Sequence, residues 1–290
     1  MTRVLAVDLG GTNLRAALHS GDLRALQPIA QESAPPGRDA FLRRLGALIE
    51  ATGADALGIA VPGLAEGTVC RWIPNLPFLD GLDLAGAFPS LSIGLGNDAQ
   101  IALLAEATAG AAEGMTDAIL LAVGTGIGSA VLSGGTIVAG TSGAACSFGW
   151  ACADLADKGE DRSGWLERAA SGRALDRIAT GHGLADGSAL IAAARQGDTA
   201  AVAALQMPAN ALGTALAGAV ALLDPQAVLI AGGLAEALDV LGPAIRDSLQ
   251  RHLPPHLRGI DLRAGTFGPR AGLVGAAVAG ARGGSWRHMR

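Results

Sequence analysis

Two aspartates stand beside possible ligand-binding turns in this sequence, and the first ends an apolar run. Asp8 closes the strand pattern of "RVLAVDLGG", and the backbone of Gly10 and Gly11 can approach a ligand without the clash that a Cβ atom would cause. Exposed amides in such a turn form an anion cradle, and a carboxylate beside it could hold a divalent cation. Taken alone, a glycine turn between two strands is more often only a turn.

The second aspartate, Asp98, follows a strand pattern in "LSIGLGNDAQIALLAEATAG". Asn97 before it is a residue type that caps helices, and Ile101, Leu104 and Ala105 recur at helical spacing. Asp98 is therefore predicted in the first turn of a helix, where its carboxylate points back toward the preceding turn. The alternative is that an aspartate in that position only complements the helix dipole, an interaction that contributes about 0.3–1 kcal/mol to stability.

A second segment repeats the strand, glycine turn and strand of the N-terminus. It reads "ILLAVGTGIGSAVL" at 119–132, and at an offset of 114 residues Gly10 aligns with Gly124 and Ala16 with Ala130. Such self-similarity indicates a duplicated fold. Two turns that face one another across a cleft could hold a polyphosphate from both sides.

The remaining elements follow an alternating α/β pattern. Strands are predicted within 54–64, up to Leu95 and before Gly232, and a long alanine-rich helix over 197–223. The turn at Gly232-Gly233 opens onto a helix, where a flat ring could lie against bare backbone. A plain strand-to-helix connection would look the same.

The composition limits the class of protein. A chain of 290 residues, half of them hydrophobic, is long enough for two globular domains. Few aromatic residues, no tyrosine and a net charge of −5 argue against a nucleic-acid stacking surface. No apolar run approaches the roughly 20 residues that cross a bilayer, and three cysteines are too few for a disulfide framework. We expect a cytoplasmic protein without nucleic-acid or membrane partners.

In order and spacing, these segments resemble the ROK family of sugar kinases, within the actin/hsp70/hexokinase superfamily. The matching strings are "DLGGTNLRAAL", "VPG" with "PNLP", "GNDAQIALLAE", "VGTGIGSAVLSGG", "LDPQAVLIAGGL" and "GPRAGLVGAA". The resemblance covers nearly the whole chain. It implies two RNase-H-like α/β domains, as in actin-like ATPases, around a central cleft. The smaller domain would comprise 1–113 and 272–290, and the larger one 114–271.

The resemblance also implies a reaction and a role for each motif. The protein would transfer the γ-phosphoryl group of ATP to a hydroxyl of a hexose or hexose derivative, as a glucokinase does, with Asp98 as general base and Asp8 orienting Mg²⁺ through water. The helix N-terminus should keep the pKa of Asp98 from rising. The expected ATP residues are Asp8, Gly10, Gly11, Thr12, Gly124, Thr125, Gly126, Gly232 and Gly233. The expected sugar residues are Gly63, Asn75, Asn97, Asp98, Ser147 and Glu167.

The loop "GTSGAACSFGW" at 140–150 departs from the family pattern. There the family reads close to Ala-Gly-Glu-x-Gly-His, whose glutamate and histidine grip the sugar near its C1 and C2 hydroxyls. Ser147 and Trp150 stand at those two positions here. Glu167 is the sugar-contact carboxylate that remains. We therefore expect a kinase with altered substrate choice at C1 and C2.

The family's structural zinc is also expected to be absent. In the family that histidine binds zinc with three cysteines, but Lys158, Glu160 and Trp165 stand at the cysteine positions of this chain. Trp150 and Trp165 could then be buried together as an apolar cluster that replaces the metal.

Two other classes of protein remain open. A non-catalytic sugar or nucleotide sensor of the same fold would turn over no ATP with any sugar. A kinase with an acyl or carboxyl acceptor, or an ATPase, would also fit the phosphate turns, but "PNLP" followed by Asn97-Asp98 favours a sugar. No helix-turn-helix region precedes the first strand, so we do not expect a repressor. By analogy with the family, a homodimer is expected.

Overall fold

The computed structural model describes residues 2–289, and the chain divides into two compact units. The first comprises the chain up to Thr116, residues Gly134–Ala145 and the chain from Thr266 onward, and the second comprises Asp117–Ser133 and Cys146–Gly265. The sequence instead assigns 134–145 to the second domain. Backbone hydrogen bonds explain the grouping, because the amide of Ile137 donates to the carbonyl of Arg287 and the amide of Met289 to that of Gly135.

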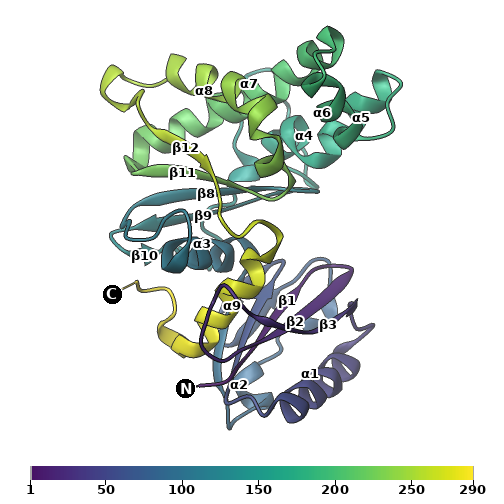
Figure 1. The fold of residues 1–290 in the computed structure, drawn as a ribbon, viewed down its shortest axis with the longest axis vertical. Helices are drawn as coiled ribbons and strands as arrows, with labels where there is room; N and C mark the ends of the chain where they lie inside the picture. The colour runs from purple at the N-terminus through teal and green to yellow at the C-terminus, as the bar shows by residue number, and fades with distance from the viewer. Residues whose placement is uncertain (1, 290) are drawn as a thin grey trace. The chain divides into compact units, whose positions relative to one another are not determined.

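The first unit is built on a five-stranded sheet with the order β3-β2-β1-β4-β7. Its elements, most of them labelled in Figure 1, are β1 (Val4–Leu9), β2 (Asn13–His19), β3 (Gln27–Ser33), α1 (Arg38–Thr52), β4 (Ala56–Val61), β5 (Leu64–Glu66), β6 (Val69–Trp72), α2 (Leu84–Ala87), β7 (Ser92–Asn97), α3 (Asp98–Ala109), β10 (Thr136–Ile137) and α9 (Ala271–Arg282).

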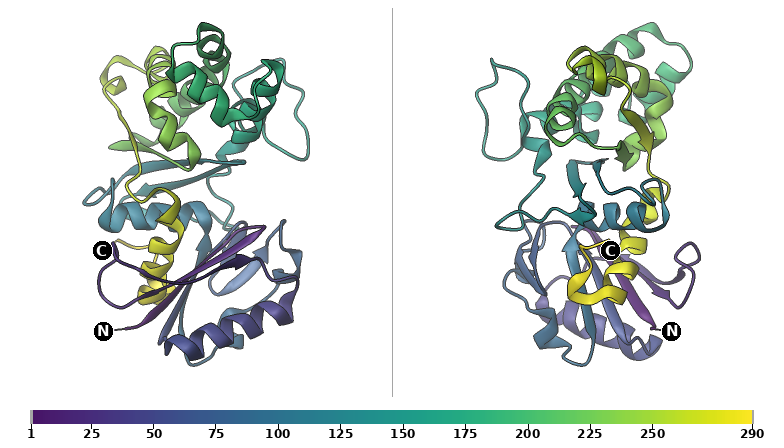
Figure 2. Two further views of the ribbon diagram at one scale, coloured as in Figure 1. Left: turned by 45° about the vertical axis from the view of Figure 1, so that its right-hand side comes forward. Right: turned by 90° about the vertical axis from the view of Figure 1, so that its left-hand side faces the viewer.

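Helices cover both faces of this first sheet. On one face, Phe41 and Leu45 of α1 share an apolar core with Leu57 and Ile59 of β4. Gly58 points to the opposite face, where a Cβ atom would lie 1.7 Å from a carbonyl oxygen of α9. Figure 2 shows α1 and α9 on the two sides of the sheet. The final helix therefore packs on the first unit, as the sequence predicts.

The second unit contains the neighbouring strands β9, β8, β11 and β12, in that order, and a helical layer. Its elements are β8 (Ala118–Val123), β9 (Ile127–Ser133), a 3₁₀ turn at Phe148–Trp150, α4 (Trp165–Ala170), α5 (Gly172–Gly181), α6 (Gly187–Arg195), α7 (Thr199–Leu223), β11 (Ala227–Ala231), a 3₁₀ turn at Gly233–Ala237, α8 (Leu238–Arg251) and β12 (Asp261–Ala264).

The two sheets repeat one topology, which confirms the duplication predicted from the glycine turns. In each sheet an antiparallel hairpin, β1-β2 or β8-β9, continues into parallel strands. The offset of 114 residues carries the bounds of β1 onto those of β8, and those of β2 onto β9.

Helix α7 departs from the sequence analysis in one respect. Its 25 residues have the length and hydropathy of a membrane-spanning helix, although no such segment was expected. More than half of its most apolar window, 56%, is buried within the protein, where α7 packs against α8. Its apolar character therefore fits a core helix.

Candidate functional site

Asp8 lies near the end of β1, where the strand register places it directly opposite Arg15 of β2. The guanidinium of Arg15 donates a hydrogen bond to the Asp8 carboxylate and forms an ion pair with it. Burial raises the pKa of Asp8, and the charge of Arg15 opposes that rise. The start of α9 packs on the same carboxylate, since a Cβ atom at Gly272 would lie 2.7 Å from it. Sequence reasoning missed Arg15 and Gly272, although cross-strand pairing about a short turn could have indicated Arg15.

The turn after β1 brings two of the predicted segments together. The amide of Gly10 donates to the carbonyl of Asn13 at 2.8 Å and closes the turn, and the carbonyl of Thr12 accepts from the amide of Ala34. A Cβ atom at Gly11 would lie 3.0 Å from the Cβ atom of Asn75. The "PNLP" loop, which contains Asn75, therefore lies against the first glycine turn.

Asn97 joins two of the expected sugar segments. Its side-chain oxygen accepts hydrogen bonds from the amides of Ala99 and Gln100, so Asn97 caps α3 as predicted. Its side-chain amide donates to the carbonyl of Gly63 at 3.1 Å. A hydrogen bond from the same side chain also reaches the Asp98 carboxylate, so Asn97 connects the Gly63 segment with Asp98.

Asp98 occupies the first turn of α3, as predicted, and its carboxylate accepts a hydrogen bond from the amide of Ala99 at 2.8 Å. The expectation for its pKa was wrong. Desolvation by the surrounding protein raises the pKa of Asp98 to about 6, the charge of Asp8 adds to the rise, and the bond from Ala99 opposes it. The side chain itself is open to solvent, which screens the charges around it. Loss of water from the carboxylate's surroundings outweighs the helix N-terminus.

Glu106, two turns further along α3, has a structural task. Its carboxylate is fully buried and accepts hydrogen bonds from the amides of Ala111, Thr266 and Phe267. It thereby ties the end of α3 to the segment before α9. Glu106 is therefore a structural residue.

The second unit holds its own glycine turn against a helix. The carbonyl of Gly124 accepts a hydrogen bond from the amide of Gly172 at 2.7 Å, at the start of α5. A Cβ atom at Gly172 would lie 2.7 Å from that carbonyl oxygen, so the approach requires glycine. Thr125, at the tip of the turn, is exposed.

Two further segments meet this turn. The Glu167 carboxylate accepts a hydrogen bond from the amide of Ile127 at 3.3 Å, and a Cβ atom at Gly126 would lie 3.0 Å from it. Gly232, with φ of 74°, lies beside the end of β8, where a Cβ atom would be 2.5 Å from the carbonyl oxygen of Val123. Gly233 then begins a 3₁₀ turn before α8, so the helix predicted directly after this turn starts later, at Leu238.

The loop that carries Ser147 is attached to β9. Ser147 is exposed, and the residues on either side of it bond the buried hydroxyl of Ser129. Gly149 packs at the second turn, because a Cβ atom there would lie 3.0 Å from the carbonyl oxygen of Ile127 and 3.4 Å from the Glu167 carboxylate. The structure thus brings Ser147, Glu167 and the second glycine turn into one region.

The expected burial of Trp150 is wrong. Its side chain is 52% exposed, whereas Trp165 packs against the core of the second unit. Both tryptophans line a surface pocket of about 230 Å³. The backbone carries the contact between loop and helix here, because a Cβ atom at Gly164 would lie 2.2 Å from the Cα atom of Trp150.

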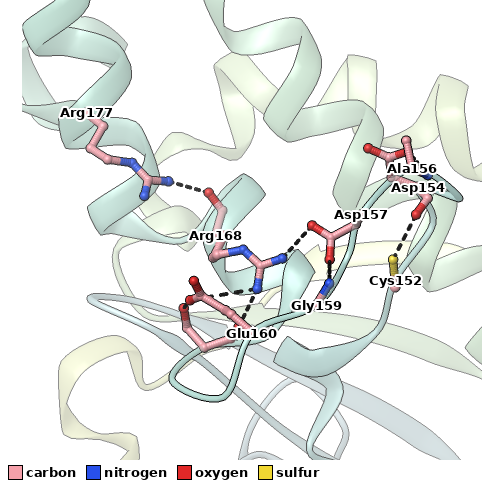
Figure 3. A network of polar contacts seen from close by, with 9 residues as sticks. Cys152, Asp154, Ala156, Asp157, Gly159, Glu160, Arg168 and Arg177 are labelled. Atoms are coloured by element: carbon pink, nitrogen blue, oxygen red, sulfur yellow. Dashed lines mark hydrogen bonds and ion pairs between the residues drawn. The ribbon is translucent and has the colours of Figure 1, made fainter.

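Arg168 of α4 organises the segment where the family pattern would place cysteines (Figure 3). Its guanidinium donates to the Asp157 carboxylate and to the carbonyl of Ser163, both at 2.5 Å, and forms an ion pair with Glu160 at 3.8 Å. A hydrogen bond from Arg168 lowers the pKa of Asp157. Within residues 2–289, no group of three or more His, Cys, Asp and Glu side chains is arranged to hold a metal ion.

Two duplicated α/β units, each with a glycine turn at the mouth of its first hairpin, define a protein of the actin-like ATPase fold. Known relatives share this fold. The ROK family model matches residues 4–281, and the chain belongs to the ROK family.

Three relatives illustrate what the chain is similar to. It is 33% identical to an N-acetylmannosamine kinase of Shigella boydii, over 94% of this chain and 97% of the relative. It is 28% identical to a glucokinase of Thermotoga maritima, over 95% and 96% of the two chains. The crystal structure of a ROK family glucokinase from Streptomyces griseus in complex with glucose and AMPPNP matches with a TM-score of 0.79 and 26% identity, over 97% and 100%.

Proposed function

We propose that this protein is an ATP-dependent sugar kinase that phosphorylates a hydroxyl of a hexose or hexose derivative, with Asp98 as general base. The relatives with known names act on hexoses or hexose derivatives, and one was crystallised with glucose and an ATP analogue. The proposed role of Asp98 as general base rests on the position of its side chain. Asn97 provides the side-chain cap of α3 and a bond to Gly63, so the exposed Asp98 carboxylate beside it is available for chemistry.

In this reaction the acceptor hydroxyl oxygen forms a bond to the γ-phosphorus of ATP, and the bond from that phosphorus to the bridging oxygen of ADP breaks. The hydroxyl proton passes to the Asp98 carboxylate. Little covalent chemistry is left to the protein, so positioning and charge stabilisation supply most of the rate. We assign the sugar to Gly63, Asn75, Asn97, Asp98, Ser147 and Glu167.

We assign the nucleotide to the two glycine turns and to the turn at Gly232-Gly233. The turn amides would face the phosphates, and the open backbone of Gly233, where a Cβ atom would meet nothing within 4 Å, would face the adenosine. Thr12 and Thr125 are exposed at the tips of the two turns.

The residues present fit Mg²⁺ bound together with ATP. Mg²⁺ keeps several waters and is held in kinases by one or two carboxylates with substrate phosphates, so a closed protein cage is not required. Asp8 supplies one carboxylate, and its field reaches Asp98. When bound, the ion would neutralise charge on the phosphates. Arg15 keeps the Asp8 carboxylate in place at the mouth of the hairpin.

Substrate choice should differ from that of relatives with the full sugar loop. A charge-assisted hydrogen bond contributes about 1.5–3 kcal/mol, so a sugar that relied on a glutamate and a histidine at positions 147 and 150 would bind more weakly here. The base and the phosphate turns are kept. We further propose a cytoplasmic location, a homodimer, and no nucleic-acid or membrane partner.

The test is a coupled ADP-release assay with a panel of hexoses, N-acetylhexosamines and acyl acceptors. We expect turnover with at least one sugar, and Asp98→Asn should lower it by about 10²–10⁴ while ATP binding changes little. The matched control is Asp39→Asn, because Asp39 is also an exposed aspartate in the first turn of a helix. Binding of sugar or ATP without any turnover would identify a sensor instead, and full activity of Asp98→Asn would place the base elsewhere.

A further inference from the structure

The loop after β10 contains a backbone conformation that needs support. Cys146 has φ of 69°, which lies in the left-handed region that residues with a Cβ atom rarely adopt. Residues in such conformations persist only where the surrounding structure over-determines them, and they cluster at functional sites. Ser147, the exposed residue expected to meet the sugar, follows directly.

Backbone hydrogen bonds within the loop, from the amide of Phe148 to the carbonyl of Cys146 and from that of Trp150 to that of Ser147, give part of the support, and a hydroxyl group of β9 attaches the loop to the sheet. Ser129 lies on β9 with 7% of its side chain exposed. Its hydroxyl donates a hydrogen bond to the carbonyl of Cys146 and accepts one from the amide of Phe148 at 3.2 Å. The two bonds flank Ser147, so a single side chain holds the backbone on both sides of that residue.

The same strand also positions the second expected sugar residue. Ile127, two residues before Ser129 in β9, donates its amide to the Glu167 carboxylate. β9 begins at the second glycine turn, so Ser147 and Glu167 are both attached to the strand that follows the expected phosphate site.

We propose that Ser129 is a positioning residue that sets the sugar specificity of this kinase by fixing Ser147 beside Glu167. This inference rests on the proposed function, since it concerns the sugar that the kinase would bind. Ser129 itself makes no contact with the sugar and acts only through the loop. A hexose held here meets a short hydroxyl side chain whose place is set by a buried hydrogen-bond pair. Without that pair, the backbone on both sides of Ser147 would lose its two hydrogen bonds to β9.

The test compares Ser129→Ala, which removes the hydroxyl, with Ser129→Cys, which keeps a side chain of similar shape but bonds weakly. Both should raise the KM for the preferred sugar by about tenfold and reduce the differences in KM between the sugars of the panel. The KM for ATP should stay within about twofold of the wild-type value, since the glycine turns are unchanged. Ser133→Ala, at the exposed end of the same strand, is the matched control and should behave as wild type.

Alkylation of the cysteines by iodoacetamide, followed by mass spectrometry, reports on the loop without relying on activity. Cys146 is partly buried, Cys152 is exposed and Cys70 is buried, so the last two serve as fast and slow references. Ser129→Ala should accelerate alkylation of Cys146 severalfold and leave the two reference rates unchanged.

An unchanged sugar KM in both Ser129 variants would overturn the proposal, even if Cys146 reacts faster. Unchanged alkylation of Cys146 would also overturn it, because the loop would then be held by other groups. A rise in the KM for ATP equal to that for sugar would indicate general damage and reject a role in specificity. If the wild-type protein phosphorylates no sugar, the proposed function fails by itself, and the attachment of the loop to Ser129 is decided by alkylation alone.

Discussion

At Asp98, opposing effects act on the pKa of one carboxylate. Backbone hydrogen bonds at the start of α3 stabilise the charged form of Asp98, whereas the surrounding protein and the charge of Asp8 destabilise it. The destabilising effects are larger, so the pKa of Asp98 is raised. A base with a raised pKa binds the substrate proton more strongly once it is transferred. Efficiency of a general base is greatest when its pKa lies near the working pH.

The raised pKa predicts the pH dependence of the reaction. Asp98 must be ionised to accept a proton, so activity is present above its pKa and is lost as the pH falls through it. With saturating ATP and Mg²⁺, kcat/KM for the sugar should rise up to tenfold per pH unit below about pH 6 and then level off. Asp39→Asn should give the same profile, and a profile that stays flat down to pH 4.5 would contradict the assignment.

Glu106 is a carboxylate whose removal should affect stability far more than chemistry. Glu106→Ala would remove the acceptor of the buried amide of Phe267 and of the part-buried amides of Ala111 and Thr266. An unsatisfied buried group costs about 1–3 kcal/mol, so the free energy of unfolding should fall by at least about 1–3 kcal/mol. Urea denaturation of the whole protein measures this. Glu113→Ala, at an exposed position, should change stability by less than about 0.5 kcal/mol, and a similarly small effect at Glu106 would show that water replaces the carboxylate.

At the scale of elements, α9 packs against the strand that carries Asp8 and the helix that carries Asp98. It packs on β1, β4 and β7 and on α3, whose first residue is Asp98. Glycine makes this packing possible, because the helix backbone touches its neighbours directly. A Cβ atom at Gly275 would lie 1.8 Å from the carbonyl oxygen of Ile101 in α3.

Gly275→Ala should therefore destabilise the protein by about 3 kcal/mol, the upper part of the range for overpacking, despite the better helix propensity of alanine. Gly46→Ala in α1 is the matched control, because a Cβ atom there meets nothing within 4 Å. It should stabilise the protein by about 0.5–1 kcal/mol. Thermal melting of both variants measures the contrast, and equal shifts would show that α9 moves aside easily.

At the scale of the whole molecule, charged and backbone groups hold the segment of the second unit where a zinc site is expected to be absent. Arg168 connects α4 with Asp157, Glu160 and Ser163 in the segment that follows the loop of Ser147. The guanidinium is a cation without a lone pair for a metal, and within residues 2–289 no group of three or more His, Cys, Asp and Glu side chains is arranged to hold one.

We therefore expect no stoichiometric zinc in the purified protein by elemental mass spectrometry. Addition of EDTA should leave the melting temperature unchanged in the absence of ATP, because no structural metal contributes to folding. One zinc ion per chain, or a melting temperature that falls by several degrees with EDTA and recovers with added zinc, would contradict this.

The local pattern of the sequence determined several features by itself. Strand, glycine turn and strand appear twice at one offset, and both hairpins form because runs of apolar residues and flexible turns act within about fifteen neighbouring residues. The cap by Asn97 and the place of Asp98 in the first turn of α3 are also local.

Features that depend on contacts between residues distant in the chain are determined only by the tertiary structure. The pKa of Asp98 is set by desolvation and by Asp8, 90 residues away, and neither is visible in a helix pattern. Trp150 is exposed, and the contact of its loop with the start of α4 is made by the backbone at Gly164. The hydroxyl of Ser129 reaches Cys146 and Phe148 only after β9 and the loop have met. Sequence patterns report hydrogen bonds and packing between near neighbours, whereas burial and long-range contacts exist only once the chain has folded.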